Sequence, residues 1–190
     1  MDVTTAIHQR RTIHEYQPGP IAPTQLHQLL EAGLWAPNHK LTQPWGFIHI
    51  GPETRAQLAD LAAGEAASTA KPGSDAASIA QLQEKTRNKL LARPTIVAVT
   101  CRRSADTVRE QEDRAAVAAA IQNIQLAAWA EGVGTKWSTG KVIKIPATAT
   151  LLGFDPAQEE IMGLLSFGQP AEIPAPKARK PLAEVLRVLP

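Results

Sequence analysis

Apolar residues recur along the chain at two spacings, and these spacings predict alternating helices and strands. Over residues 23–35 they repeat every three or four positions, which defines one face of an amphipathic helix. Pro37 disfavours helical geometry at the residue before it, so we expect this helix to end there. Residues 45–50 form a strand candidate. The polar residues 38–43 therefore make a loop between a helix and a strand, a position where functional sites are often built.

Two other segments have the character of buried strands. Residues 95–100 are apolar and β-branched at consecutive positions, as in a strand that is covered on both faces. Residues 161–167 are similar and stop at Gly168-Gln-Pro170, and residues 133–140 are expected to be extended. Further helices are expected over residues 3–9, from Pro52 onward, and over 76–91, 112–131 and 146–152.

Two of these segments allow more than one interpretation. Residues 64–75 are small and polar, so they fit either an Ala-rich helix or a mobile loop, and we favour a loop or lid that begins near Lys71. The Ala-rich helix over 112–131 carries little bulk on its apolar face. That face fits close packing either in the core of the domain or against a second subunit.

Composition indicates one domain, residues 1–190, with a layered α/β or α+β architecture. The net charge is only +2, which gives no sign of nucleic-acid binding. Cys101 is the single cysteine, so no disulfide forms within the chain, as expected of a protein in the reducing cytoplasm. We read neither a signal peptide nor an apolar run long enough to cross a membrane.

Several common catalytic templates are missing from the sequence. Gly132-Val-Gly134 lacks the third glycine of a dinucleotide-binding fingerprint and follows a helix rather than a strand. No phosphate-binding glycine loop with its lysine, and no Gly-x-Ser-x-Gly motif, is present. The five histidines show neither paired spacing nor cysteine partners, so no metal site is expected.

Arg10-Arg11-Thr12 is the clearest remaining candidate for binding chemistry. It fits either a solvated helix end or a phosphate clamp, because arginine donates a planar fork of hydrogen bonds and threonine adds a hydroxyl. Lys177 and Arg179 lie near the other end of the chain and would complete such a clamp if the fold brings the two ends together.

Three segments, in this order and spacing, resemble the FMN-dependent nitroreductase family: Arg10-Arg11-Thr12, residues 36–45, and Glu131-Gly-Val-Gly134 leading to Trp137-Ser-Thr-Gly140. Gly168-Gln-Pro170 and the basic tail extend the resemblance over nearly the whole chain. It is most similar to the short bacterial YdjA-type subgroup. The resemblance implies an α+β nitroreductase-like fold, with a mostly antiparallel sheet flanked by helices, working as an intertwined homodimer with FMN at the interface.

The resemblance also implies a set of site residues. Arg10, Arg11 and Thr12 would hold the phosphate and ribityl chain, with Lys177 and Arg179. Trp137–Gly140 would lie along the flavin ring, and Trp35 and His39 would reach it from the other subunit. The full set expected to bind the cofactor is Arg10, Arg11, Thr12, His14, Trp35, Pro37, Asn38, His39, Gln43, Trp137, Ser138, Thr139, Gly140, Gly168, Lys177 and Arg179. The nicotinamide would approach Ala127, Ala128, Trp129, Ala130, Glu131 and Gly132.

The sequence departs from the family pattern at two positions. His14 stands where the family often has a second basic residue that stabilises negative charge on the flavin. Either His14 has this role or another cation does, such as Arg87 or Lys89. Ser138 stands where the subgroup tends to have arginine. Both departures concern substrate choice and flavin potential rather than FMN binding.

The implied activity is an NAD(P)H oxidoreductase that passes hydride through FMN to a nitroaromatic, a quinone or a similar electron-poor acceptor. No side chain is required as an acid or base, because the flavin carries the chemistry. One alternative is a flavoprotein that uses reduced FMN for reductive dehalogenation or flavin fragmentation. Another is a non-catalytic FMN-binding protein. The sequence does not choose between NADH and NADPH.

Overall fold

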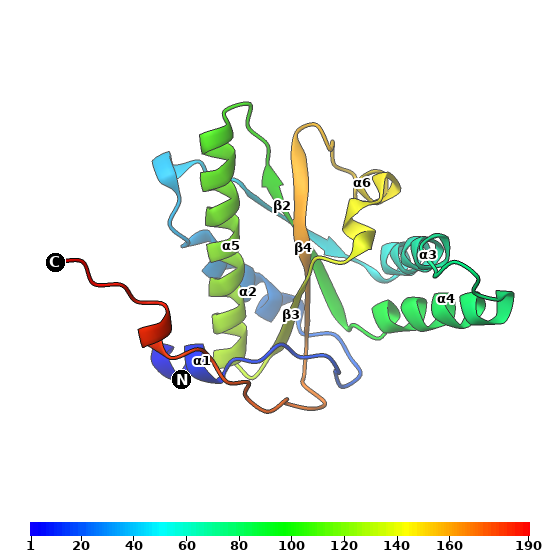
Figure 1. Ribbon diagram of the computed structural model, residues 1–190, viewed down its shortest axis with the longest axis horizontal. Helices are drawn as coiled ribbons and strands as arrows, with labels where there is room; N and C mark the ends of the chain where they lie inside the picture. The colour runs from blue at the N-terminus through cyan, green and yellow to red at the C-terminus, as the bar shows by residue number, and fades with distance from the viewer.

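One antiparallel sheet of four strands forms the centre of the molecule (Figure 1), and the computed structural model describes all residues 1–190. The strands are β1 (Trp45–Ile50), β2 (Thr95–Arg102), β3 (Gly134–Ser138) and β4 (Glu159–Gly168). Their order across the sheet is β1-β2-β4-β3, and every neighbouring pair is antiparallel. The expectation of an α+β fold with a mostly antiparallel sheet is confirmed.

The central strand β2 is apolar at consecutive positions because helices cover both faces of the sheet. Val97 and Val99 belong to a buried cluster on one face, and Ile96 and Ala98 belong to a second cluster on the other. Residues 95–101 are all buried. A strand buried on both faces carries apolar residues at consecutive positions rather than alternating apolar and polar residues. The sequence of residues 95–100 shows this consecutive pattern.

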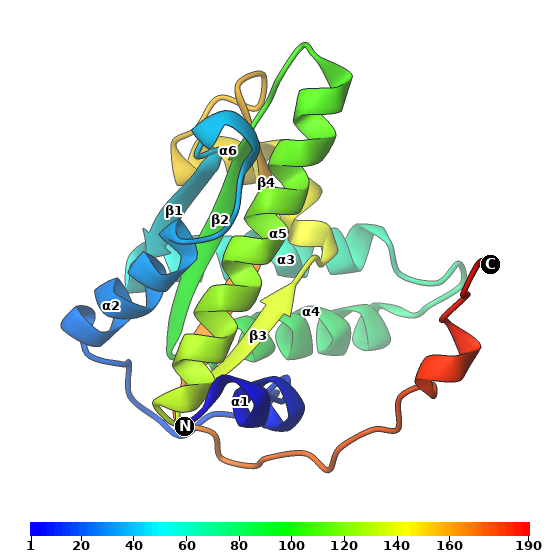
Figure 2. The ribbon, with the colours of Figure 1, turned by 90° about the vertical axis from the view of Figure 1, so that its left-hand side faces the viewer.

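The helices divide between the two faces of the sheet (Figures 1 and 2). They are α1 (Val3–Gln9), α2 (Pro23–Leu34), α3 (Pro52–Ser68), α4 (Ala76–Leu91), α5 (Thr107–Ala130) and α6 (Pro146–Leu152). Helix α2 packs on α5 over one face, and α4 packs on α3 beside the other. The Ala-rich face of α5 is buried in the core through Val117, Ala120, Ile121, Ile124 and Ala128.

Helix α5 is longer than the sequence indicated, and helix α3 ends within a segment that the sequence left open. Helix α5 begins at Thr107 because the Asp106 carboxylate accepts hydrogen bonds from the amides of Val108 and Arg109, a standard N-cap. Helix α3 continues to Ser68, so the first part of residues 64–75 is helical. The loop between α3 and α4 begins at Thr69 and ends at Asp75, which caps α4.

The two ends of the chain meet at the β3 edge of the sheet. Thr12 forms a parallel bridge with Thr135, and the Ile13 amide donates to the Thr135 carbonyl at 3.0 Å. Tyr16 bridges Pro170 at the start of the tail. Beyond this point the tail extends away from the body, with a 3-10 turn at Leu182–Glu184 (Figure 2). No helix has the length and apolar character needed to cross a membrane.

Candidate functional site

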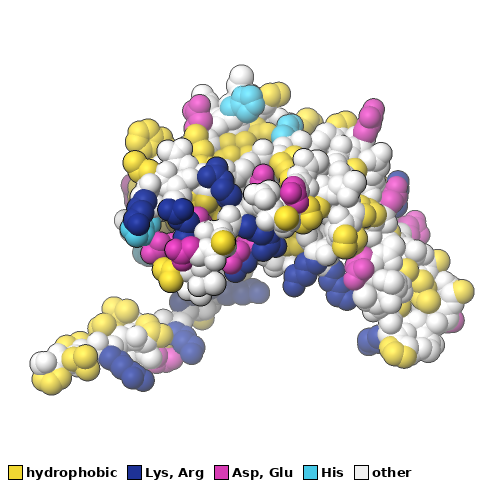
Figure 3. Space-filling view, turned by 90° about the horizontal axis from the view of Figure 1, so that it is seen from above, with side chains coloured by type: hydrophobic (Ala, Val, Ile, Leu, Met, Phe, Trp, Pro, Cys, Tyr) yellow, Lys and Arg dark blue, Asp and Glu magenta, His cyan; other side chains and the backbone are white.

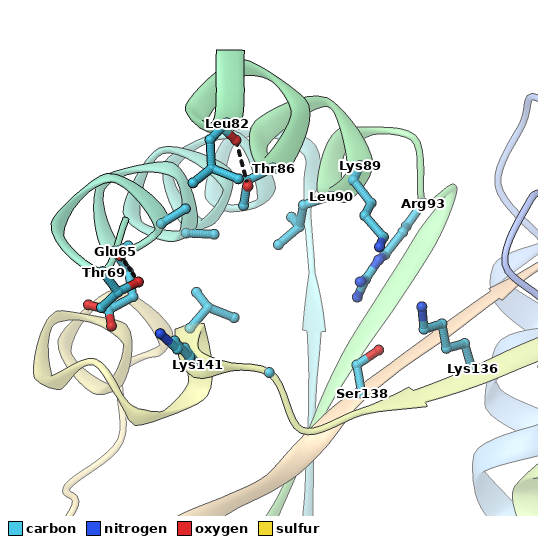
Figure 4. Close-up of a pocket in the computed structure, with 14 residues that line it drawn as sticks. Glu65, Thr69, Leu82, Thr86, Lys89, Leu90, Arg93, Lys136, Ser138 and Lys141 are labelled. Atoms are coloured by element: carbon cyan, nitrogen blue, oxygen red, sulfur yellow. Dashed lines mark hydrogen bonds between the residues drawn. The ribbon is translucent and has the colours of Figure 1, made fainter. Parts of the chain in front are cut away.

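A cavity of about 540 Å³ lies between the α3–α4 pair and strand β3 (Figure 4). Its apolar surface comes from small and medium side chains of both helices and of the segment after β3. Its polar surface includes four cationic side chains and a single carboxylate, Glu65. The cations are Lys89, Arg93, Lys136 and Lys141.

Elements that are distant in sequence bring three of these cations together. The side chains of Lys89 and Arg93 run side by side from the end of α4, and Lys136 points toward them from β3 (Figure 4). Successive side chains of a strand point to opposite faces, so Lys136 and Ser138 share the face that lines the cavity. Thr135 on the other face is buried and accepts a hydrogen bond from Gln125 at 3.2 Å.

Two polar atoms in the wall of this cavity have no partner within the protein. The hydroxyl oxygen of Ser138 and Nη1 of Arg93 are both buried and make no hydrogen bond. An unsatisfied buried polar group costs roughly 1–3 kcal/mol, so proteins rarely keep one without a reason. The pair is therefore suited to a ligand that offers polar atoms to this part of the cavity.

The crowding of positive charge alters the ionisation of several groups. Burial, followed by the charges of Arg93 and Lys89, lowers the pKa of Lys136. Nδ1 of His14 lies 3.3 Å from Nζ of Lys136. Burial, followed by the charges of Lys136, Lys89 and Lys177, lowers the pKa of His14. A negatively charged ligand would relieve this repulsion.

A second group of cations lies at the end of α1. Burial, followed by the charges of Arg11 and Arg179, lowers the pKa of Arg10. The fold thus brings the N-terminal arginines and the basic tail together. None of the three arginines forms an ion pair with a carboxylate. Arg11 donates from Nη1 to the carbonyls of His8 and Arg10. Unpaired arginines beside a threonine hydroxyl have the chemistry of a phosphate site.

The loop over residues 38–43 lies elsewhere. His39 pairs with Glu112 at 2.7 Å, and Thr42 donates to the buried Asp113 at 2.6 Å. Asp113 is twelve residues before Gln125 on α5, which is roughly 18 Å along the helix axis. Gln125 bonds to Thr135 of β3. Within a single chain, the loop of residues 38–43 therefore lies far from the cations beside β3.

Backbone strain in this loop sets it apart from an ordinary connection. Lys40, Leu41 and Gln43 have φ values of 54°, 53° and 45°, in the left-handed region that non-glycine residues rarely adopt. The Asn38 side chain supports this conformation by accepting a hydrogen bond from the Gln43 amide at 2.9 Å. Pro37 precedes this turn. Such strain often marks a functional site.

The remaining expected residues occupy several places. Ser138 and Gly140 line the cavity, and Thr139 lies between them. The Trp137 indole donates to the Met162 carbonyl at 3.0 Å, and Gly168 pairs with Gly134. Trp35 is 87 % exposed and lines a separate groove with Ala127 and Ala130. None of residues 127–132 lines the cavity beside β3.

Sequence reasoning missed Arg93, Lys136 and Lys141. Lys136 had a usable signal, because it lies two residues before Ser138 in a segment that was expected to be extended. Arg93 had none, since its place depends on how α4 meets β2. Of the two alternative cations, Lys89 lines the cavity, whereas Arg87 is paired with Asp60 at 2.6 Å and does not line it.

The family of the chain follows from a comparison with known proteins. The model of the Nitroreductase family matches residues 7–169. The chain belongs to this family. The match runs from the Arg10 segment through β4, so it includes Arg10, Arg11, the cations of the cavity and the strained loop, but not Arg179 of the tail.

Individual members of the family agree with this assignment. The chain is 30% identical over 181 residues to YfhC of Bacillus subtilis, covering 94% of this chain and 89% of that protein. It is 32% identical over 174 residues to YdjA of Escherichia coli K12, covering 90% and 89%. Both carry the name "Putative NAD(P)H nitroreductase". These findings confirm the resemblance to the YdjA-type subgroup and support an oxidoreductase.

A solved structure extends the similarity to the fold. A protein from Desulfovibrio desulfuricans, solved in complex with FMN, is 29% identical and superimposes with a TM-score of 0.76. The alignment covers 100% of this chain and 98% of that one. The nitroreductase-like fold expected from the sequence is therefore confirmed.

Proposed function

We propose that the protein is an FMN-dependent NAD(P)H oxidoreductase that reduces nitroaromatics, quinones or similar electron-poor acceptors. The observation that carries the proposal is the unpaired cluster of Arg10, Arg11 and Arg179, joined through the Thr12–Thr135 bridge to the strand that lines a cavity with two unsatisfied polar atoms. A ligand with an anionic end and a polar ring would satisfy both features.

The residues present fit FMN in both charge and placement. Arg10, Arg11 and Thr12, with Lys177 and Arg179 from the tail, would hold the phosphate. Residues 137–140 would support the ring, and the unsatisfied atoms of Ser138 and Arg93 would meet its polar edge. When bound, FMN would supply hydride transfer between NAD(P)H and the acceptor.

The side chains of the protein would bind and orient rather than exchange protons. No group of His, Cys, Asp and Glu side chains is arranged to hold a metal ion. In the net reaction of a nitro acceptor, NAD(P)H and one proton convert the nitro group into a nitroso group and water. Solvent would supply the proton, because the cations around the cavity are positioned to hold negative charge.

We further propose that the active form is a homodimer. Trp35 lies in an apolar groove of about 390 Å³ formed by α1, α2 and α5. The tail projects from the body with apolar side chains on its surface (Figure 3), and Val185, Val188 and Leu189 are exposed. A second copy would cover both apolar surfaces and bring its Asn38–Gln43 loop to the first copy's flavin. The unpaired Cys101 suits a cytoplasmic location.

FMN and riboflavin, which differ by the phosphate, provide a matched test. We expect the apoprotein to bind FMN at least a hundredfold more tightly than riboflavin, as measured by quenching of flavin fluorescence. Losing one charged contact in Arg10→Gln should weaken FMN binding by about ten- to a hundredfold and leave riboflavin binding nearly unchanged. Arg109→Gln, at the exposed start of α5, is the control. Equal affinities for the two flavins would overturn the phosphate site.

A further inference from the structure

We propose that the cavity beside β3 selects aromatic acceptors that carry a carboxylate or another anionic group, and that Lys141 recognises the anion. This inference rests on the proposed function, because the acceptor would occupy the part of the cavity that the flavin leaves open. It names a substrate class by charge and goes beyond the electron-poor ring that the reaction requires.

The balance of charge in the wall is the first argument. Lys89, Arg93, Lys136 and Lys141 face a single carboxylate, that of Glu65. The flavin phosphate has its own cations at Arg10, Arg11 and Arg179, none of which lines the cavity. If one cavity cation offsets the negative charge of reduced flavin, three remain against one carboxylate. A concave site lined by one sign of charge attracts ligands of the opposite sign.

The arrangement of the wall is the second argument. Lys89, Arg93, Lys136 and Ser138 gather at one end, whereas Lys141 lies at the other end with Glu65 and Thr69 (Figure 4). The first group borders the region where the flavin ring would rest. Lys141 is exposed and forms no ion pair, so its charge is free to meet a ligand.

The apolar part of the wall is the third argument. Apolar side chains also line the cavity: Ala62, Ala66, Leu82, Leu90 and Val142. An aromatic ring would bury apolar surface against them, and a substituent at its far side would reach Lys141. The cavity therefore combines apolar surface with cations at both ends, which matches an aromatic acid better than a neutral arene.

The pair 4-nitrobenzoate and 4-nitrobenzamide tests the inference directly, because they share ring and nitro group and differ in charge. The FMN-bound protein is reduced anaerobically with dithionite, so that NAD(P)H is absent, and is mixed rapidly with each acceptor. The measured quantity is the ratio of the second-order reoxidation rate constants, benzoate over benzamide. Comparing this ratio between variants cancels the intrinsic difference in reactivity of the two compounds.

We expect Lys141→Gln to lower the ratio about three- to tenfold, the range for one partly screened charge contact. Glu65→Gln should raise the ratio by a similar factor, because it removes the opposing charge. Lys144→Gln is the matched control, since Lys144 is exposed on the same turn but does not line this cavity. Its ratio should stay within twofold of the wild-type value.

Binding without turnover gives an independent readout. Calorimetric titration of the oxidised, FMN-bound protein should show that Lys141→Gln weakens benzoate binding and leaves benzamide binding unchanged. Unchanged ratios and unchanged benzoate affinity in both Lys141→Gln and Glu65→Gln would overturn the inference. So would a defect of Lys141→Gln that appears only in the rate at which NADPH reduces the flavin, because the cation would then serve the phosphates of the reductant.

Failure of the inference is distinguishable from failure of the proposed function. A protein that binds no FMN, or whose FMN passes no electrons to either nitro compound, contradicts the proposed function itself. A protein that reduces 4-nitrobenzamide well and shows the same ratio in every variant keeps its function and loses only the anionic specificity.

Discussion

Individual side chains around β3 show how the fold changes the chemistry of a residue. His14 is exposed, yet it lies 3.3 Å from the Lys136 amine and within reach of two further lysine charges. Partial loss of contact with water is the first cause of its lowered pKa, and these charges are the second. The positive charges that act on His14 are those of Lys136, Lys89 and Lys177.

The ionisation of His14 is measurable by NMR through its ring protons. In the apoprotein we expect His14 to titrate below the ordinary value of about 6.5, and Lys136→Gln to raise its pKa by removing a nearby charge. Because the folded pKa is lowered, the neutral histidine favours the folded state above pH 6.5, and this contribution is lost as the pH falls below that value. A titration that is the same in wild type and Lys136→Gln would contradict the assigned cause.

At the level of elements, the strained loop of residues 38–43 depends on its attachment to α5. Asp113 is 5 % exposed, and the Thr42 hydroxyl is its side-chain hydrogen-bond partner. Left-handed residues cost free energy, which a few strong contacts must offset. The loop conformation is therefore coupled to the first turns of α5.

Thr42→Val tests this attachment. The variant leaves a buried carboxylate without its hydroxyl donor, so we expect the free energy of unfolding to fall by about 1–3 kcal/mol. Denaturant unfolding monitored by circular dichroism provides the measurement. Thr24→Val, on the exposed first turn of α2, makes the same chemical change without a lost partner and should shift stability much less. Equal shifts in the two variants would show that the Thr42–Asp113 contact does not stabilise the fold.

Strand β4 sets the position of Trp137 through a glycine. A Cβ atom at Gly163 would collide with the Trp137 indole, which bonds to the neighbouring Met162 carbonyl. Gly163→Ala should therefore displace Trp137 and weaken both folding and FMN binding. Gly64→Ala is the matched control, because nothing lies within 4 Å of its added Cβ and it lies inside α3. There alanine should stabilise the protein by about 0.5–1 kcal/mol. If Gly163→Ala unfolds and binds FMN like wild type, the tryptophan position does not depend on that glycine.

The sequence predicted elements better than it predicted which residues meet. Helices cover both faces of β2 and β4, so these strands are apolar at consecutive positions. This pattern over residues 95–100 and 161–167 was enough to predict buried strands. The end of α3 was not clear, since Ala-rich residues fit a helix and a loop equally well. The site beside β3 depended on Arg93 and Lys136, whose contacts arise from tertiary packing. No local pattern specified that these two side chains lie beside Lys89.

At the level of the whole molecule, the exposed apolar residues are the feature that a single copy leaves unexplained. Trp35 is 87 % exposed and Leu189 is 84 % exposed. Stable obligate dimers bury about 2,000 Å² or more, with a more apolar interface than transient complexes have. In the proposed dimer, a second copy would cover the groove of α1, α2 and α5 and the apolar side chains of the tail.

Trp35→Glu tests the dimer in solution. A charge in this groove should shift the protein from dimer to monomer in sedimentation velocity and weaken FMN binding at the same protein concentration. Val108→Glu is the matched control, because Val108 is also exposed but lies at the other end of α5, outside the groove. A wild-type monomer that binds FMN and turns over acceptor at full rate would contradict the proposed assembly.

Anaerobic reduction of the bound flavin by NADH or NADPH tests the central proposal most directly. The purified protein is loaded with one FMN per chain, and the visible absorbance of the flavin is followed. We expect at least one of the two reductants to bleach the flavin within a catalytic timescale, and a nitroaromatic or quinone to restore its absorbance. A protein that holds FMN tightly but is bleached by neither reductant would be a binding protein and not an NAD(P)H oxidoreductase.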